Sequence, residues 1–373
     1  MAIDTQDAID PQVAVDPIGN GVVVWTKKTY DAGHLNIVSN TVWARRYVSG
    51  IWQPAIRISD APVADFFAFS PAVATDVNGK ILVVWTQYAT ATTVHGIWST
   101  RFDGTNWSPP QLRSDGTRTT YDAHVASGAL GNFMAIWTQD TSLPGVAGPR
   151  PNLWAQRYSS TGWGTAVPIG YTVLATGDGA AHPYLAMNAS GNVVVAWEQT
   201  QSVNVSIAGN RYDVGAAQWG TAARIDAASS PASSPTVALD SAGNAMAVRL
   251  QSDGTAMNAW ASRDTGSGWQ TTPKQLGITG SNVQKVSIDM DGSGNALAAW
   301  QQNPTNTFNP TLMAQRYLLT TAWAGSASTP SLTGTDMALD VNSSGKALVV
   351  AKQKVSSVTA GSQTAPWALL YQP

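Results

Sequence analysis

The stretch GNGVVVW at residues 19–25 decides the fold, because variants of it return at regular intervals along the chain. Each copy opens with Gly followed by Asn or Lys, continues with mostly apolar residues, and in five copies ends in Trp. The copies begin at Gly19, Gly79, Gly131, Gly191, Gly243, Gly294 and Gly345. They are 51 to 60 residues apart, and Gln stands two residues after the Trp position in six of the seven. Repetition at this period indicates a chain of seven similar supersecondary units.

Each unit is predicted to contain four short strands. The first has the pattern P-x-V-A-x-D, as at residues 11–16 and 71–76, and the Gly-Asn pair after it suits a tight hairpin. In the second strand, odd and even positions are both apolar, as in residues 22–25, which is typical of a strand buried on both faces. The third carries W-x-x-R-Y or a variant, and the fourth begins at a further Trp. Four-stranded units of this length predict a β-propeller, in which each unit is one blade.

The predicted fold is therefore an all-β, seven-bladed β-propeller with four antiparallel strands per blade, a single domain over residues 1–373. The last repeat ends with its third strand at Tyr371, so it has no fourth strand of its own. Residues 1–4 match the end of a fourth strand such as residues 56–58. We expect this N-terminal segment to close the last blade and to remove the open strand edges. A chain that begins within a strand also suggests that a leader has been removed.

The composition excludes several classes of protein. Lys and Arg total 21 against 23 Asp and Glu, and this near balance argues against a general nucleic-acid partner. No apolar run approaches the roughly 18 residues that a membrane span needs. The chain has no Cys, which excludes disulfides, thiolate zinc sites and cysteine nucleophiles.

The pattern P-x-V-A-x-D-x-x-G-N-x-x-x-x-W resembles the seven-fold propeller repeats of exported bacterial proteins and is loosely similar to repeats of the NHL type. The resemblance covers nearly the whole chain. It implies a secreted or cell-surface propeller with an extracellular ligand. It carries over no functional residues, because the Asp-box of sialidases, the Trp-Asp pairs of WD40 repeats and the calcium loop of integrin-type blades are not evident.

Side chains that recur in every repeat are expected to be structural. The 16 Trp fall at recurring positions on the second, third and fourth strands, where we expect them to pack between blades. A lectin that repeats its site once per blade is the alternative. Recurring Arg and Asp are predicted to form a ring of charge-assisted hydrogen bonds, with a repeated anion-binding site as the alternative. The Arg are Arg46, Arg101, Arg157, Arg211, Arg263 and Arg316, and the Asp are Asp16, Asp76, Asp240, Asp289 and Asp340.

Residues that break the repeat are the better candidates for ligand binding, because the scaffold does not require them. Six positions before the end of the first strand, the first five repeats carry Asp10, Ser70, Asp122, His182 and Ser234. We expect them to ring the mouth of the central channel on the long-loop side, where carboxylates and His could bind a metal or transfer protons. The alternative is that Asp and Ser cap turns. The predicted ligand-binding residues are Asp10, Asp65, Tyr121, Asp122, His124, His182 and Tyr184, with Phe66, Phe67 and Phe69 nearby.

Asp289, Asp291 and Ser293 resemble part of a calcium loop, since oxygen-bearing side chains alternate before a Gly, although an ordinary turn is the alternative. No cofactor is expected beyond a structural or channel calcium ion. The leading functional hypothesis is a non-enzymatic propeller that binds a carbohydrate or another extracellular ligand on its long-loop face. A polysaccharide hydrolase or lyase that uses the Asp and His residues is the first alternative, and a protein-interaction scaffold is the second.

Overall fold

The protein is described by a computed structural model that covers residues 7–33, 36–60, 66–89, 94–129, 131–142, 148–171, 178–201, 204–227, 230–278, 282–303, 310–323, 335–342, 345–355 and 363–371. The chain forms two compact units, Met1–Pro183 with Ala189–Gly191 and Tyr184–Asn188 with Asn192–Pro373. The described residues form strands and no helix, which confirms the all-β prediction for this part of the chain. Within these ranges there is accordingly no helix that could cross a membrane.

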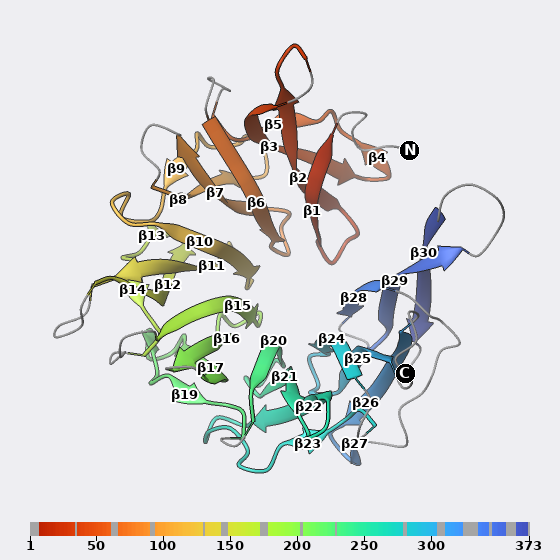
Figure 1. Ribbon diagram of the computed structural model, residues 1–373. Helices are drawn as coiled ribbons and strands as arrows, with labels where there is room; N and C mark the ends of the chain where they lie inside the picture. Colours follow the sequence, from red (N-terminus) through yellow and green to blue (C-terminus); the bar gives the residue numbers. More distant parts are fainter. Residues whose placement is uncertain are drawn as a thin grey trace. The chain divides into compact units, whose positions relative to one another are not determined.

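The first unit contains three complete repeats and the beginning of a fourth (Figure 1). Repeat one consists of β1 (Ala8–Val15), β2 (Gly21–Tyr30), β3 (Ile37–Val48), β4 (Ile51–Trp52) and β5 (Ile56–Arg57). Repeat two consists of β6 (Phe66–Thr75), β7 (Ile81–Ala89), β8 (Gly96–Phe102) and β9 (Gln111–Leu112). Repeat three consists of β10 (Thr120–Ser127), β11 (Phe133–Thr141), β12 (Arg150–Ser159), β13 (Gly162–Trp163) and β14 (Val167–Pro168). A short parallel pairing of β3 with β6 joins repeats one and two into one sheet.

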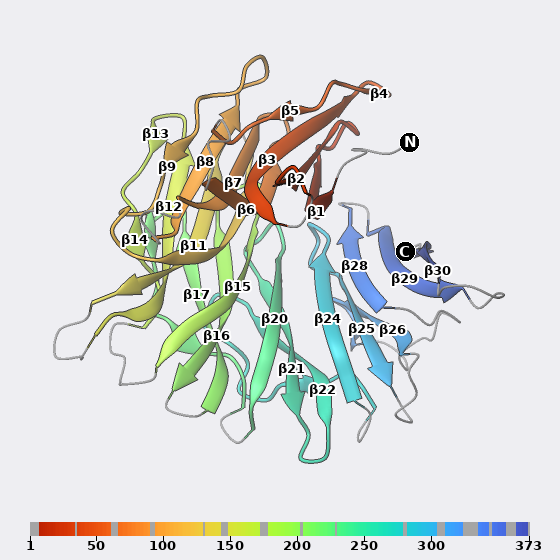
Figure 2. The same cartoon turned by 45° about the horizontal axis from the view of Figure 1, so that its top comes forward.

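The second unit contains the remaining repeats, and the strands of repeat five lie alongside one another in Figure 2. Repeat four consists of β15 (Gly179–Met187), which crosses the boundary between the units, β16 (Val193–Gln201), β17 (Asn204–Asp213), β18 (Gln218–Trp219) and β19 (Ala223–Arg224). Repeat five consists of β20 (Ala232–Leu239), β21 (Ala245–Ser252), β22 (Met257–Asp264) and β23 (Lys274–Gln275). Repeat six consists of β24 (Asn282–Met290), β25 (Ala296–Asn303), β26 (Thr311–Leu318) and β27 (Ala322–Trp323), and repeat seven of β28 (Thr335–Val341), β29 (Ala347–Val355) and β30 (Gln363–Tyr371).

Each repeat is an antiparallel meander in chain order, as predicted. The fourth strand is shorter than expected: in repeat one it is split into β4 and β5, which both pair with β3. A short outer strand leaves few unpaired backbone groups, which limits edge-to-edge association. The segment that was expected to close repeat seven, residues 1–4, lies outside the described residues.

The apolar core lies between the faces of neighbouring sheets. In β7, Val83 and Trp85 belong to a buried cluster shared with repeat one, whereas Leu82 and Val84 belong to a cluster shared with repeat three. Alternate residues of a strand point to opposite faces, so the second strand of each inner repeat contributes to two cores. This confirms that the second strand is buried on both faces.

The recurring Gln has a structural explanation. The indole N–H of the second-strand Trp donates to the Oε1 of the Gln two residues later, for example from Trp85 to Gln87 at 2.8 Å. The same bond joins Trp137 to Gln139 (3.2 Å), Trp197 to Gln199 (3.0 Å) and Trp300 to Gln302 (2.8 Å). Trp is buried in all four repeats, and a buried indole N–H needs an acceptor. The W-x-Q pattern is therefore a unit of the scaffold, as expected for recurring Trp.

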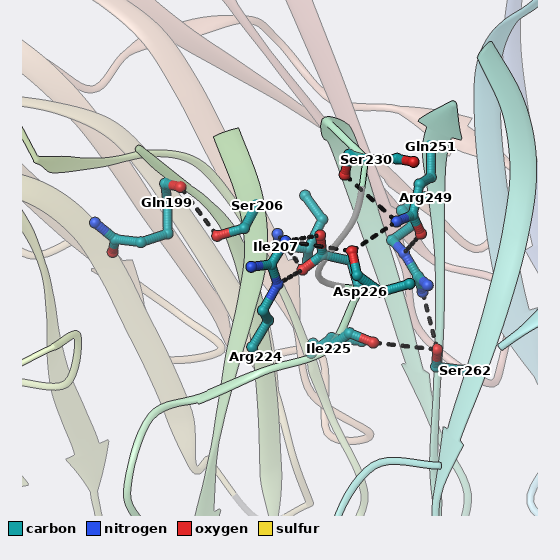
Figure 3. Close-up of polar contacts among 11 residues, drawn as sticks. Gln199, Ser206, Ile207, Arg224, Ile225, Asp226, Ser230, Arg249, Gln251 and Ser262 are labelled. Atoms are coloured by element: carbon teal, nitrogen blue, oxygen red, sulfur yellow. Dashed lines mark hydrogen bonds and ion pairs between the residues drawn. The ribbon is translucent and has the colours of Figure 1, made fainter. Parts of the chain in front are cut away.

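Repeat five replaces this Trp with Arg249, whose side chain is fully buried (Figure 3). Its Nε donates to Gln251 Oε1 at 3.0 Å, and its Nη1 donates to Ser262 Oγ at 2.9 Å. Arg224 forms two hydrogen bonds to the buried carboxylate of Asp226, which also accepts from the backbone N–H of Ile207. Arg249 thus keeps the hydrogen bond that Trp makes in other repeats and adds a buried positive charge.

Candidate functional site

The five residues predicted to ring a channel mouth share an unusual backbone conformation. Their φ angles are 51° (Asp10), 50° (Ser70), 53° (Asp122), 46° (His182) and 52° (Ser234). In repeats one, two, three and five, the pairing with the second strand shifts at this residue, which marks a β-bulge. Asp and His are enriched among the non-Gly residues that adopt positive φ. The bulge therefore accounts for much of the residue choice here, and we call these five the bulge residues.

The backbone N–H of a bulge residue can be held by a carboxylate from the preceding repeat. In the first unit, Asp122 Oδ2 accepts from the N–H of His182 at 3.4 Å. In the second unit, Glu198 Oε1 accepts from the N–H of Ser234 at 2.8 Å. Glu198, the sole Glu of the sequence, therefore has a scaffold contact.

Tyr121, Asp122 and His124 lie together on β10. Tyr121 pairs with Thr138 and His124 with Ile136, so both side chains lie on one face of the sheet despite the bulge between them. Burial and the nearby carboxylates of Asp140 and Asp122 raise the pKa of Tyr121 to about 12. Burial lowers the pKa of His124, and the charge of Asp122 opposes this shift. Both rings are consequently neutral at pH 7, and both can form hydrogen bonds with a polar ligand.

The other predicted ligand-binding residues do not all join this group. Asp10 is exposed at the bulge of β1, and Asp65 lies outside the described residues. Tyr184 belongs to the second unit, and the residue is 38% exposed. Partial desolvation raises the pKa of Tyr184, and the charges of Asp289 and Asp340 in the same unit raise it further. Tyr184 is thus grouped with these two carboxyls.

The structure corrects the alignment of the recurring Asp residues in repeats six and seven. The turn after the first strand is held by Asp16 in repeat one, whose Oδ1 accepts from the N–H of Asn20. In repeat six the equivalent acceptor is Asp291, which accepts from the N–H of Asn295. In repeat seven it is Asn342, which accepts from the N–H of Lys346. Asp289 and Asp340 therefore lie two residues earlier and do not belong to the turn series. The repeat pattern was misaligned because D-x-D at 289–291 offers two candidates for one position.

Of the three residues that resemble a calcium loop, Asp291 is engaged by its own turn. Its Oδ1 accepts from the N–H groups of Ser293 and Asn295, and its Oδ2 accepts from Asn295 Nδ2. Asp289 instead accepts from the N–H groups of Met290 and Val341, which ties β24 to β28. Among the described residues, no group of three or more His, Asp or Glu side chains is placed to hold a metal ion.

An aromatic cluster lies at the opposite end of repeat two from the Gly-Lys turn. Tyr88 stacks on Phe67 with ring centroids 5.3 Å apart and on His95 with centroids 4.5 Å apart. Phe69 meets Tyr88 and His95 edge-on, at 5.9 and 6.0 Å. All four side chains are half-buried, so each ring keeps some surface accessible to solvent. We call Phe67, Phe69, Tyr88 and His95 the aromatic cluster.

A pocket of about 210 Å³ shares Tyr88 with this cluster and lies mainly on the other face of the sheet, the face of Gln87 and Trp98. Its lining consists of Phe66, Gln87, Tyr88, Val94, Gly96, Trp98, Leu112 and Gly116. The lining is largely apolar, with one amide side chain, one indole and one phenol, which is the usual composition of a small-molecule site. Gln87 is held in place, since it accepts from Trp85 and donates to Asp60 at 3.4 Å.

Gly96 helps to open the pocket. A Cβ at this position would lie 2.7 Å from Leu112 Cδ1 and 3.3 Å from Trp98 Nε1. The equivalent residue is Thr41 in repeat one, Asn152 in repeat three and Asn258 in repeat five. Repeat two therefore lacks a side chain where these other repeats have one, and the missing atoms leave space beside Leu112 and Trp98.

His95 is fixed by the neighbouring repeat. Its carbonyl oxygen accepts from the backbone N–H of Thr120 at 3.0 Å and from the Thr120 hydroxyl at 2.8 Å. Burial lowers the pKa of His95, so its imidazole is neutral at pH 7. Thr120 pairs with Gln139 and Tyr121 with Thr138, so the side chains of Thr120 and Tyr121 lie on opposite faces of the sheet. Tyr121 and His124 lie on the face turned away from the core that repeats two and three share, so the aromatic cluster and the polar side chains of β10 are two separate groups in the first unit.

Sequence reasoning noted the three Phe residues, but it did not include Tyr88, His95 or Gly96. Tyr88 and Gly96 break the repeat. The residue three positions after the second-strand Trp is Lys28, Asp140, Thr200, Ser252, Asn303 or Lys354 in the other repeats. The sequence therefore already marks Tyr88 as the one aromatic residue at this repeat position.

No family model matches the sequence, and a search of curated proteins finds no match. Among solved structures, a protein of unknown function from Dyadobacter fermentans has 13% identity and a TM-score of 0.49, with 84% of this chain and 97% of that chain covered. An α-L-arabinanase from Penicillium chrysogenum in complex with arabinobiose has 12% identity and a TM-score of 0.47, with 84% and 94% covered. The six-bladed β-propeller lectin of Aleuria aurantia, which recognises fucose, has 13% identity and a TM-score of 0.39, with 85% and 95% covered. At these values the function of this chain has to be inferred from its own residues.

Proposed function

We propose that this chain is a carbohydrate-binding β-propeller that holds a sugar against the aromatic cluster of repeat two. The observation that carries the proposal is the stack of Phe67, Tyr88 and His95, in which Tyr88 takes a position where no other repeat has an aromatic residue. A 210 Å³ pocket opened by Gly96 adjoins Tyr88 from the other face of the same sheet. Aromatic rings carry a negative face, which attracts the weakly positive C–H groups on the flat side of a sugar ring. Stiff aromatic side chains also provide contact area at a low cost in conformational entropy.

We propose that the polar side chains of β10, on the face of that sheet turned away from repeat two, form a second group that binds sugar hydroxyls. Tyr121 and His124 are neutral at pH 7, and neutral phenol and imidazole groups each both donate and accept hydrogen bonds. Asp140 lies close enough to Tyr121 to raise its pKa, and burial raises the pKa of Asp140 itself. We infer that the aromatic cluster provides the apolar contact and that the polar group of β10 adds hydrogen bonds where a longer glycan reaches it.

Binding without turnover is the function that this geometry supports best. A glycosidase of the usual kind needs two carboxyl groups at a set separation. Asp122 accepts a hydrogen bond from the backbone of the next repeat, so a structural task accounts for its position. A hydrolase or lyase that uses Asp122, and a pure protein-interaction scaffold, are the competing functions.

We further propose that all seven repeats close into one propeller domain over residues 1–373, with the N-terminal segment completing the last blade, and that the protein acts outside the cell. Face-to-face packing of successive sheets within each unit supports the propeller. Removal of residues 1–6 tests closure. We expect this deletion to lower the melting temperature and to promote aggregation through an exposed strand edge, and an equally stable monodisperse protein would contradict it.

The binding function is tested by screening the protein on a glycan array and titrating the hits by calorimetry. Tyr88→Ala should weaken binding about tenfold, because Tyr88 stacks on both Phe67 and His95 and its loss removes the ring that holds these two in place. Thr200→Ala changes the equivalent position of repeat four and is the matched control. Equal affinity of wild type and Tyr88→Ala would contradict the proposed site, and product release that stops in Asp122→Asn would favour the enzyme.

A further inference from the structure

A second pocket lies at the other end of the sheet, between repeats one and two. Its volume is about 180 Å³, and residues of the two Gly turns and of the third-strand ends line it. The polar lining residues include Asp16, Asn20, Arg46, Thr75 and Asn78. Two aromatic rings, Tyr47 and Phe102, complete the wall. The turn side of the repeats therefore also offers a pocket, whereas the sequence predicted ligand binding on the long-loop side.

Arg46 is the charged donor of this pocket. Its guanidinium carbon lies 3.9 Å from the centre of the Phe102 ring, and Phe102 is buried in the core between the repeats. Burial lowers the pKa of Arg46. Within the described part of the chain, no acceptor hydrogen-bonds to the Arg46 guanidinium. A guanidinium has five N–H donors. The half-buried Arg46 can therefore offer several of them to a ligand in the pocket.

Equivalent Arg residues show which groups satisfy such a guanidinium. Arg211 of repeat four forms an ion pair with the buried carboxylate of Asp264 at 3.0 Å and also donates to the carbonyl of Gly243. Arg316 of repeat six donates to the carbonyl of Gly345 at 3.0 Å. Phe102 occupies in repeat two the position that Asp264 occupies in repeat five. The junction of repeats one and two thus has a ring where the junction of repeats four and five has a carboxylate.

From this comparison we propose that the pocket binds the carboxylate group of a small molecule, with Arg46 as its main partner. A guanidinium pairs with a planar carboxylate through two parallel hydrogen bonds, and the Phe102 ring holds the guanidinium in place. The ligand supplies the acceptor that Asp264 supplies to Arg211. The recognised chemistry is the carboxylate, whether it belongs to an acidic sugar or to a simple organic acid.

Asp16 also lines the pocket, and its charge has to be considered. Its Oδ1 accepts from the N–H groups of Ile18 and Asn20 at 3.1 and 2.8 Å, and its Oδ2 accepts from Asn20 Nδ2 at 3.0 Å. These donors from the turn stabilise the negative charge within the protein. A ligand with hydroxyl groups can still donate to the remaining lone pairs of Asp16. A hydroxylated carboxylate should therefore bind more tightly than a carboxylate alone.

The test is calorimetric titration of the full chain with glucuronate, acetate, glucose and sulfate. Glucuronate and acetate should bind, with glucuronate tighter, and glucose should not bind at this pocket. Arg46→Gln should weaken glucuronate binding at least tenfold, the loss expected for a charged hydrogen bond. Arg101→Gln is the matched control, because Arg101 stacks on Tyr158 in the same way but has the carboxylate of Asp103 nearby. Tyr88→Ala should leave acetate affinity unchanged, since it alters only the aromatic site.

Equal binding of glucuronate to wild type and a folded Arg46→Gln protein would overturn the proposal. Tighter binding of sulfate than of acetate would overturn the assignment to carboxylates. If Arg46→Gln fails to fold, Arg46→Lys retains the charge but not the planar fork, and it should weaken acetate binding at least threefold. A crystal of the wild-type protein soaked in glucuronate gives an independent measurement. Density with its carboxylate within hydrogen-bond distance of Arg46 supports the proposal, and a ligand-free pocket overturns it.

Discussion

In repeat five, the buried guanidinium of Arg249 donates its Nε–H to Gln251 Oε1 at 3.0 Å, the hydrogen bond that a Trp indole makes in four other repeats. Desolvation lowers the pKa of Arg249 to about 10, and its Nη2 is buried without a hydrogen-bond partner among the described residues. One requirement of the scaffold, a donor aimed at Gln, is therefore met by two chemically different side chains. The charged one carries the larger desolvation cost.

Replacing Arg249 with Trp should stabilise the protein. The indole keeps the bond to Gln251 and removes a buried charge, and such replacements by well-packed apolar groups often stabilise by about 1–4 kcal/mol. Asp226 keeps its two hydrogen bonds from Arg224, so it is not left unpaired (Figure 3). Chemical denaturation should show a higher midpoint for Arg249→Trp and a lower one for Arg249→Lys, which keeps the charge but loses the planar donors. A lower midpoint for Arg249→Trp would contradict this account.

Trp137 is the second-strand Trp of repeat three and corresponds to Arg249 of repeat five. Its side chain is fully buried, so Trp137→Ala should cost about 3–5 kcal/mol of unfolding free energy. Carbohydrate binding by the folded fraction should persist, because Trp137 lies in the core between sheets and not in the aromatic cluster. Denaturation and calorimetry on the same preparation measure both quantities. A stable variant that no longer binds would show that this Trp contacts the ligand.

These contacts explain how far the sequence could predict the fold. Repeat length and apolar patterning were sufficient for the four-stranded units, because burial of the second strand on both faces leaves a continuous apolar stretch. The bulge in the first strand was not predictable from patterning, although Asp10, Asp122 and His182 marked its position. Their residue types were interpreted as ligand chemistry, whereas positive φ explains much of the choice.

The candidate site could be predicted only in part. Phe67 and Phe69 were noted as exceptions to the repeat, but the stacking of Tyr88 between Phe67 and His95 depends on how two strands and a loop meet. The pocket was not predictable, since it results from a missing side chain at Gly96. Arg46 was assigned to a structural ring, and the sequence alone could not show that this guanidinium lies over the Phe102 ring, whereas Arg211 meets the carboxylate of Asp264.

The pKa of Asp289 predicts a pH dependence of stability. Burial and the nearby charge of Asp340 raise it to about 7, although hydrogen bonds from Val341 and Met290 lower it. A carboxyl whose pKa is higher in the folded than in the unfolded state contributes stability that is fully present below pH 4 and is lost as the pH rises through about 7. The titration of Asp289 should therefore lower the melting temperature of wild type as the pH rises from 4 to 7. Asp289→Asn lacks this group, so its melting temperature should fall less over the same range. Parallel pH profiles of the two proteins would contradict the assignment.

Filling the pocket of repeat two should abolish binding without removing an aromatic ring. Gly96→Thr introduces the residue that repeat one has at this position, Thr41. Repeat one also has a Ser at the position of Ser114, namely Ser59, so the fold accommodates Thr and Ser together. Ser59 and Ser114 both accept a buried backbone N–H, at 3.0 and 3.1 Å, so this contact should survive the substitution. The new side chain displaces Leu112 into the pocket, and carbohydrate affinity should fall at least tenfold. Retained affinity in a protein with an unchanged melting temperature would exclude the pocket from the binding site.

The most direct measurement is a crystal structure of the wild-type protein soaked with the tightest-binding glycan from the array. The account predicts density for a sugar ring stacked on the accessible face of the aromatic cluster. A glycan bound only elsewhere, or a ligand-free cluster at saturating glycan, would contradict the proposed carbohydrate site.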